Sequence, residues 1–279
     1  MTASIFALRR GSRRAIGWAS KQETCAVIFG LDPQLFVAAA MVALFAGFVK
    51  GAVGFALPMI LISGLSSFLP ADQALAGLIL ATLLLNVAQA FRQGVGAALG
   101  SVRKYWLLIG CVVLAIGASA PLVAVLPDRV MYLLLGVPIA AFTLSQLVGW
   151  QLILHARHRA RAEVAMGLVG GFFGGISGVW GPPVIAYLLS FNTEKMEMVR
   201  VQGVVFLIGA VMLLAAHLGS GVLNAQSLPF SAALVIPAAA GMWVGFRVQD
   251  RLDPTRFRKA TLVILTLAAV NLVRKGVMG

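Results

Sequence analysis

Apolar runs of about 20 residues alternate with short polar or basic segments along the whole chain. In the first half they occupy residues 34–69, 73–91, 105–126 and 130–154. In the second half they occupy residues 164–191, 198–218, 228–246 and 260–273. A run of about 20 apolar residues is long enough to cross the hydrocarbon core of a bilayer as a helix. The pattern predicts an all-α, polytopic membrane protein.

The second half of the chain repeats the pattern of the first. An offset of 124–126 residues aligns much of the two halves. We therefore expect a basic N-terminal tail at residues 1–33, a first membrane repeat at 34–154, a basic connecting loop at 155–162 and a second membrane repeat at 163–279.

A glycine motif occurs once in each half, as GFVKGAVGFALP at residues 47–58 and GFFGGISGVWGP at residues 171–182. Both copies have the spacing G-x3-G-x2-G-x3-P. Glycine and proline tend to break or kink a helix, and a broken helix at membrane depth is tolerated only where protein buries it or where it lines a cavity. Matching breaks in two halves are a pointer to a transporter's binding site. The residues to which we assign a helix-breaking or structural role are Gly47, Pro58, Gly171, Gly175 and Pro182.

The charge distribution favours one of two topologies. If each motif-containing block crosses the membrane twice, the chain has ten segments and the halves are inverted. The basic loops at residues 92–104, 155–161 and 247–259 then share one side of the membrane, as the positive-inside rule favours. If each block crosses once, the chain has eight segments, the halves are parallel and loop 247–259 lies outside. We favour the inverted arrangement, although the basic tail and Arg274-Lys275 violate the rule.

The overall charge indicates membrane lipid as a partner, and the sequence predicts no cofactor. The chain has 22 Lys and Arg against 9 Asp and Glu, and hydrophobic residues make up 60% of it. The basic residues stand in short tracts between apolar runs, which indicates contact with anionic lipid and not with nucleic acid. Cys25, Cys111 and the three histidines have no metal-binding spacing, so we predict neither a metal nor a cofactor.

Carboxylates are absent from the middle of every apolar run. Cation pathways and proton relays usually depend on intramembrane carboxylates, so this absence argues against a cation pump. It also argues against carboxylate acid/base catalysis, and we predict that the protein is not an enzyme. No ATP-binding loop of the form G-x4-G-K-[ST] is present, so transport would draw its energy from a gradient or a partner.

The first motif contains the one positive charge within a glycine cluster, Lys50. It either offers its charge to an anion or snorkels from a helix end to the interface, and the matching position in the second motif is Gly174. A helix that restarts after a break presents unpaired N–H groups and a positive dipole end, which bind anions. The predicted substrate-binding residues are Lys50, Gly51, Gly54, Phe55, Ser177, Gly178, Val179, Trp180 and Gln202.

Two plainer interpretations compete with this site. The motif glycines also form GxxxG pairs, which permit close helix packing. Polar residues elsewhere in the spans are more typical of hydrogen bonds between helices than of a substrate site. These are Asn86, Gln89, Gln146 and Asn271.

At these motifs the sequence resembles the TauE/SafE family of sulfite and organosulfonate permeases, over residues 34–275. Members have two homologous halves, each opening with a stretch of the type GxxxGxxGxGGG. Here Ala56-Leu57-Pro58 stands where the family has further glycines. The resemblance implies a multi-pass protein of the bacterial inner (cytoplasmic) membrane that moves a small sulfur-containing anion. A membrane-embedded enzyme or assembly factor and a cation exporter are the alternatives, and the coupling ion and a homo-oligomer are left open.

Overall fold

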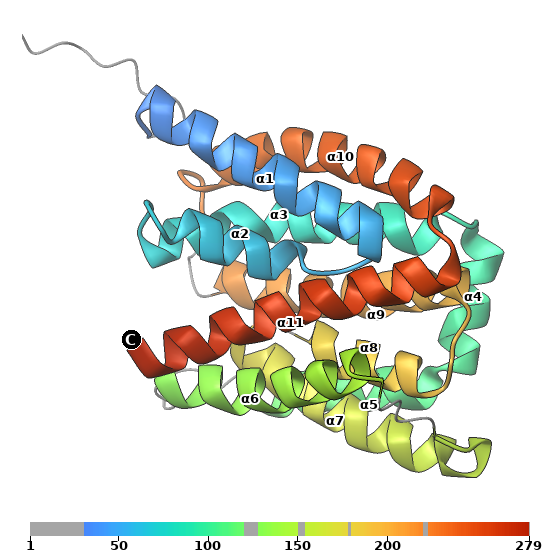
Figure 1. Ribbon diagram of the computed structural model, residues 1–279. Helices are drawn as coiled ribbons and strands as arrows, with labels where there is room; N and C mark the ends of the chain where they lie inside the picture. The colour runs from blue at the N-terminus through green and yellow to red at the C-terminus, as the bar shows by residue number, and fades with distance from the viewer. Residues whose placement is uncertain (1–30, 120–127, 150–153, 178–179, 220–222, 279) are drawn as a thin grey trace, which may run out of the picture.

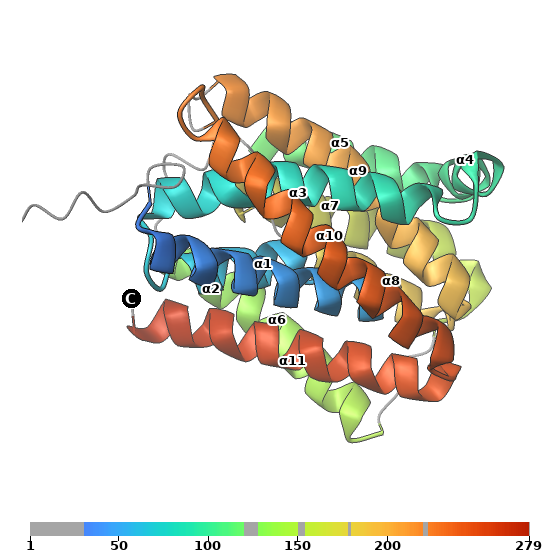
Figure 2. The ribbon, with the colours of Figure 1, turned by 90° about the horizontal axis from the view of Figure 1, so that it is seen from above.

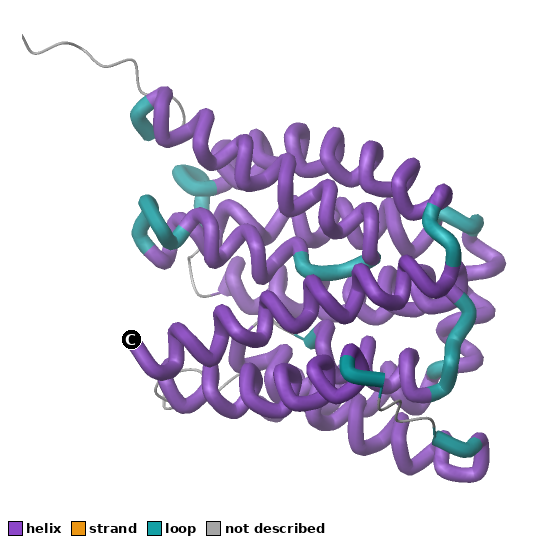
Figure 3. The backbone as a smooth tube through the Cα atoms, viewed as in Figure 1, coloured by secondary structure: helices purple, strands orange, loops and turns teal. Residues whose placement is uncertain are grey.

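The computed structural model describes residues 31–119, 128–149, 154–177, 180–219 and 223–278, and within them the regular structure is helical (Figures 1 and 3). The helices are α1 (Pro33–Val53), α2 (Leu57–Leu65), α3 (Ala71–Phe91), α4 (Val95–Lys104), α5 (Trp106–Ser119), α6 (Asp128–Leu147), the 3₁₀ helix η2 (Ala156–His158), α7 (Arg159–Ser177), α8 (Gly181–Ser190), α9 (Lys195–Gly219), α10 (Leu228–Arg251) and α11 (Pro254–Met278).

Several of these helices are long and apolar enough to cross a membrane. Four of them pass this test alone, namely α1, α3 from Gln73 onward, α10 and α11. The pair α4 and α5 passes it together, although the two helices meet at an angle of 79°. The predicted all-α, multi-pass membrane protein is thereby confirmed.

Each motif-containing block folds as a hairpin of one long and one short helix. In the first block α2 returns along α1. The two helices are so close that a Cβ added to Gly64 would lie 2.5 Å from Val42 Cγ1. In the second block α8 returns along α7, and the Tyr187 hydroxyl donates to Glu163 Oε1 at 2.8 Å. The short helices have 9 and 10 residues, so each extends about 15 Å or less, roughly half of the hydrocarbon core.

The basic segments gather at one end of the molecule. Figures 1 and 2 show α4, the start of α9 and the junction of α10 with α11 at the same end. Ion pairs join them there, between Lys104 and Glu197 at 2.5 Å and between Arg92 and Asp250 at 2.7 Å. Helix α1 begins at the opposite end and α7 begins at this one (Figure 1).

Two of the expected basic loops are largely helical. Residues 95–104 form α4, and only Leu252 and Asp253 separate α10 from α11. Helix α4 buries Ala98 and Ser101 while Val95 and Leu99 stay exposed. A short amphipathic helix of this kind suits the membrane interface, where a purely polar loop was expected.

Helices of the two halves pair across the halves. Helix α1 packs mainly on α10, α7 on α5, α3 on α9 and α6 on α11. In the predicted repeat α1 corresponds to α7 and α10 corresponds to α5, so each half supplies the partner of the other half's first helix. The core is therefore shared between the halves.

The motif glycines make this pairing close. A Cβ on Gly47 would overlap the carbonyl oxygen of Ala238 in α10, and one on Gly171 would overlap that of Val112 in α5. Gly51 and Gly175 likewise abut Met242 and Ser119. Contrary to the helix-breaking role we assigned to Gly47, Gly171 and Gly175, α1 and α7 continue through all four glycines. Small residues there let the backbones approach each other.

Candidate functional site

The first hairpin turns at residues 54–56, between α1 and α2. Gly54 and Ala56 both have left-handed backbones, with φ of 90° and 76°. The Gly54 N–H donates to the Lys50 carbonyl at 2.7 Å and so closes α1. A side chain at residue 54 would meet the amide oxygen of Gln202, so this glycine is required by both conformation and space.

The turn leaves backbone donors free at the start of α2. Ile60 N–H donates to the Ala56 carbonyl at 3.0 Å. Among the described residues, no acceptor is hydrogen-bonded to the backbone N–H groups of Phe55, Leu57 or Met59. The start of α2 is therefore the positive end of a helix with unused donors.

Lys50 is buried beside this turn. Only 2% of its surface is exposed. Its Nζ donates to Asn86 Oδ1 at 2.5 Å and to Gln89 Oε1 at 2.7 Å, both on α3. The lysine therefore does not snorkel to the interface, and both of its hydrogen-bond acceptors are neutral amides.

The two amides are held so that their oxygens face the lysine. Asn86 Nδ2 donates to the Phe206 carbonyl at 3.1 Å. Gln89 Nε2 donates to the carbonyls of Gly54 and Val199, at 2.9 and 2.8 Å. Carbonyl oxygens only accept, so these bonds assign the nitrogen and the oxygen of each amide.

A small cavity lies where the two hairpin turns meet. Its walls come from both glycine motifs, from α3 and from α9: Lys50, Phe55, Ala56, Pro58, Met59, Asn86, Trp180, Gly181, Pro182 and Phe206. The centre of a water molecule can occupy about 20 Å³ of this cavity, which is room for about one water-sized group. Because this open volume is so small, a solute larger than water would enter only if these walls separated.

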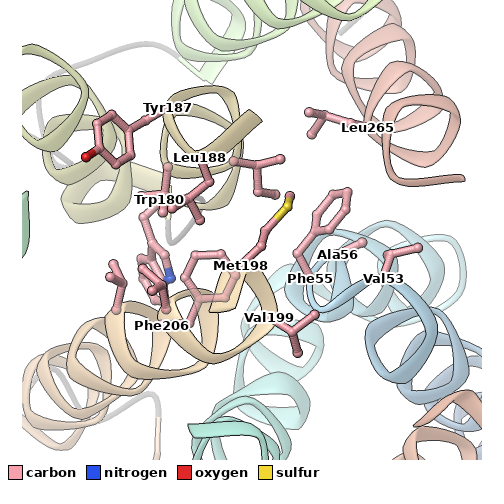
Figure 4. Close-up of a cluster of buried hydrophobic side chains, with 14 of the residues drawn as sticks. Val53, Phe55, Ala56, Trp180, Tyr187, Leu188, Met198, Val199, Phe206 and Leu265 are labelled. Carbon is pink, nitrogen blue, oxygen red and sulfur yellow. The ribbon is translucent and has the colours of Figure 1, made fainter. Parts of the chain in front are cut away.

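The second turn contributes an aromatic side chain to the cavity. A Cβ on Gly174 would lie 3.0 Å from Trp180 Cβ, and one on Gly209 would lie 2.9 Å from the indole ring. Trp180 is therefore seated between two glycines, on α7 and α9. Figure 4 shows Trp180 beside Phe206, and Phe55 facing Met198 from the first turn.

The structure gathers part of the predicted substrate-binding set. Lys50, Phe55 and Trp180 line the cavity, and so do Pro58 and Pro182, to which we had assigned a structural role. Other predicted members lie elsewhere or outside the description. Gly51 packs on α10, Gly54 and Gln202 lie side by side behind the turn, and the side chain of Ser177 and residues 178–179 are outside the described residues.

Gln202 is an unusual member of this set. It is fully buried, and neither its amide oxygen nor its amide nitrogen has a hydrogen-bond partner among the described residues. A buried amide without partners is costly, so this residue is a candidate for a contact made in another state of the protein.

Some cavity residues were not predicted as substrate-binding. Asn86 was interpreted as a residue that joins helices, and it does so through Phe206 while also holding Lys50. Its signal was a polar residue inside an apolar span. Met59 and Phe206 had no signal, because apolar side chains on membrane helices are the rule.

Comparison with known proteins places the chain in a family. The sequence profile of the family described as Sulfite exporter TauE/SafE matches residues 39–272. No curated protein and no solved structure matched the chain. The matched region contains both glycine motifs and every cavity residue described above. The chain belongs to the sulfite exporter TauE/SafE family of membrane transporters.

Proposed function

We propose that this transporter moves a small sulfur-containing anion across the bacterial inner membrane. The substrate would be sulfite, a sulfonate or a related organic anion, held in the cavity between the two hairpin turns. The observation that carries the proposal is that Lys50 and both glycine motifs line one buried cavity.

The charge of the cavity favours an anion. Lys50 is the only ionisable side chain among the cavity-lining residues, and its two acceptors are uncharged. A buried ammonium needs a compensating negative charge, which a bound anion would supply. The free N–H groups of Phe55 and Leu57 at the start of α2 add donors for anion oxygens.

The remaining walls favour a compact solute with an apolar part. Phe55, Met59, Trp180 and Phe206 offer carbon surface around the lysine. A sulfonate has a charged head and a short apolar body, and it suits such a lining. Because the cavity has room for about one water-sized group, its walls must separate to admit a sulfonate, and further still to admit a larger solute.

The arrangement of the halves supports transport by alternating access. Ion pairs and hydrogen bonds join the halves at the basic end, including the pair between Lys104 and Glu197. We propose that the halves are inverted repeats and that the cavity opens to one side of the membrane at a time, as in other transporters with broken helices.

The proposal is tested by uptake into proteoliposomes containing the purified protein. We compare sulfite and methanesulfonate uptake by the wild type, Lys50→Met and Lys259→Met, the last of which removes an exposed lysine of α11. Loss of a buried charged partner costs about 2–5 kcal/mol of binding, or a roughly 30- to 5,000-fold lower affinity. Normal uptake by Lys50→Met, with the protein inserted, would refute the proposed site.

A further inference from the structure

The geometry around Lys50 leaves one position on its nitrogen unused. An ammonium carries three N–H donors, and two of them are directed at Asn86 Oδ1 and Gln89 Oε1. Within the described residues no acceptor is hydrogen-bonded at the third position, and Lys50 lines the cavity. The same two bonds also suit the neutral amine, which has two N–H donors and one lone pair.

The groups packed around Lys50 cannot share this charge. On α3 it meets the two amides, and on α9 it faces the Phe206 ring, whose centroid is 5.9 Å from Nζ. The other cavity-lining residues, on α2, on α8 and in the turns before them, carry no ionisable group, and α10 faces α1 through Met242 and Gly245. None of these groups is titratable.

Charged residues of the neighbouring helices have partners at the basic end of the molecule. Arg92 of α3 pairs with Asp250 of α10, and Glu197 of α9 pairs with Lys104. Arg200 of α9 donates to Gln93 and Ser101. The net charge of the cavity is thus decided by two things only: the protonation of Lys50 and the charge of the solute.

From this geometry we infer that Lys50 is a proton-binding site that couples anion transport to proton transport. The inference rests on the proposed function, because it takes the cavity as the anion site. A monovalent anion enters together with one proton from the same side of the membrane. The proton binds the lone pair of the Lys50 amine, and the third N–H then donates to the anion.

Charge balances in both states of this cycle. The occupied cavity holds one ammonium and one anion, and the empty cavity holds a neutral amine, so its net charge is zero in each case. On the other side the anion leaves and Lys50 returns its proton to water. Anion and proton therefore move in the same direction in equal numbers, and transport of a monovalent anion carries no net charge.

The test uses methanesulfonate, which stays ionised at all accessible pH values and cannot carry the proton itself. We measure its uptake into proteoliposomes with an acidic exterior, and then with an imposed membrane potential and no pH difference. Wild-type uptake is expected to rise at least fivefold with the proton gradient and to ignore the potential. Lys50→Arg keeps a permanent charge, so its uptake is expected to lose the response to pH and to respond to the potential. Lys259→Arg serves as the matched control.

A second measurement needs no transport. Methanesulfonate is added to purified wild-type protein in weakly buffered detergent with a pH-sensitive dye, across a range of starting pH. Proton uptake that approaches one per bound anion at the alkaline end supports the inference, and its loss in Lys50→Met assigns it to this residue.

The two hypotheses fail in different ways. Proton coupling would be overturned if methanesulfonate uptake ignored the pH gradient and carried net charge, and if methanesulfonate bound the purified protein without proton uptake. That result would leave the anion transporter intact. Absence of binding and of uptake for sulfite and methanesulfonate alike would overturn the proposed function, and the coupling inference with it.

Discussion

The two hairpin turns share their glycines and differ in what lies beside them. The first turn holds Lys50 with two amides of α3. At the position that corresponds to Lys50 the second turn has Gly174, and Trp180 packs over it. One turn thus offers a charge and hydrogen bonds to the cavity, and the other offers an aromatic wall.

The difference has a simple steric cause. A Cβ on Gly174 would already be 3.0 Å from Trp180 Cβ, so a lysine could enter only if the indole moved. The repeated glycines determine how closely the helices pack, and the residues that are not repeated determine the chemistry. A site between two similar halves is therefore asymmetric, with one half binding the charge and the other half shaping the space.

We call the first turn, at residues 54–56, the polar turn and the second turn, which contributes Trp180, the aromatic turn. The largest effect is expected from Gly54→Leu at the polar turn. Its left-handed backbone costs a residue with a side chain about 1–2 kcal/mol, and the new side chain would collide with Gln202. We expect transport of sulfite to be lost while the protein still inserts in the membrane. Gly96→Leu on α4 is the control, because nothing lies within 4 Å of a Cβ there. Equal transport by both variants would remove Gly54 from the site.

A smaller effect is expected when a carboxylate of the protein itself neutralises the charge of Lys50. Asn86→Asp would place a carboxylate next to Lys50 Nζ, where Asn86 Oδ1 now lies at 2.5 Å. The internal ion pair competes with the anion, so we expect affinity for methanesulfonate to fall about tenfold or more, equivalent to about 1.4 kcal/mol. Isothermal titration on purified protein measures this. The control is Asn271→Asp, an amide on α11 that bonds to Ser63 away from the cavity.

The smallest effect is expected at the aromatic turn. Trp180→Phe removes the indole N–H and keeps most of the ring at the cavity wall. Loss of one hydrogen bond to the anion is worth about 0.5–1.5 kcal/mol, so we expect a two- to tenfold weaker affinity. Trp243→Phe, at an exposed tryptophan of α10, is the control. A larger loss than that of Asn86→Asp would reverse the roles of the two turns.

The sequence predicted the helices and the place where they break, because periodic glycines and long apolar runs are local signals. The turn at Gly54 follows from those signals. They left open whether Lys50 faces an anion or snorkels to the interface, and its burial is seen only in the structure. The partners of Lys50 could not be predicted as such, since Asn86 and Gln89 are 36 and 39 residues away in sequence. Which helix receives a glycine face is equally non-local, as the contact of Gly47 with Ala238 illustrates.

Helix α4 and the joined α10 and α11 show a different limit. Residues 92–104 contain Gly94, Gly96 and Gly100 together with basic residues, a composition typical of loops. Their helical structure depends on tertiary contacts, among them the bond between Arg200 and Ser101. Such contacts override local propensity, and a pattern along one chain does not contain them.

The pairing of α1 with α10 has a consequence for biosynthesis. Helix α1 leaves the ribosome long before its main partner α10 is made. Until then the glycine face of α1 is in contact with lipid. Only when α10 arrives can Gly47 and Gly51 reach the backbone they contact in the finished protein. A chain that stops before α10 is therefore not a smaller transporter. It is a set of helices in which the glycine face of α1 lacks the helix that covers it in the finished protein.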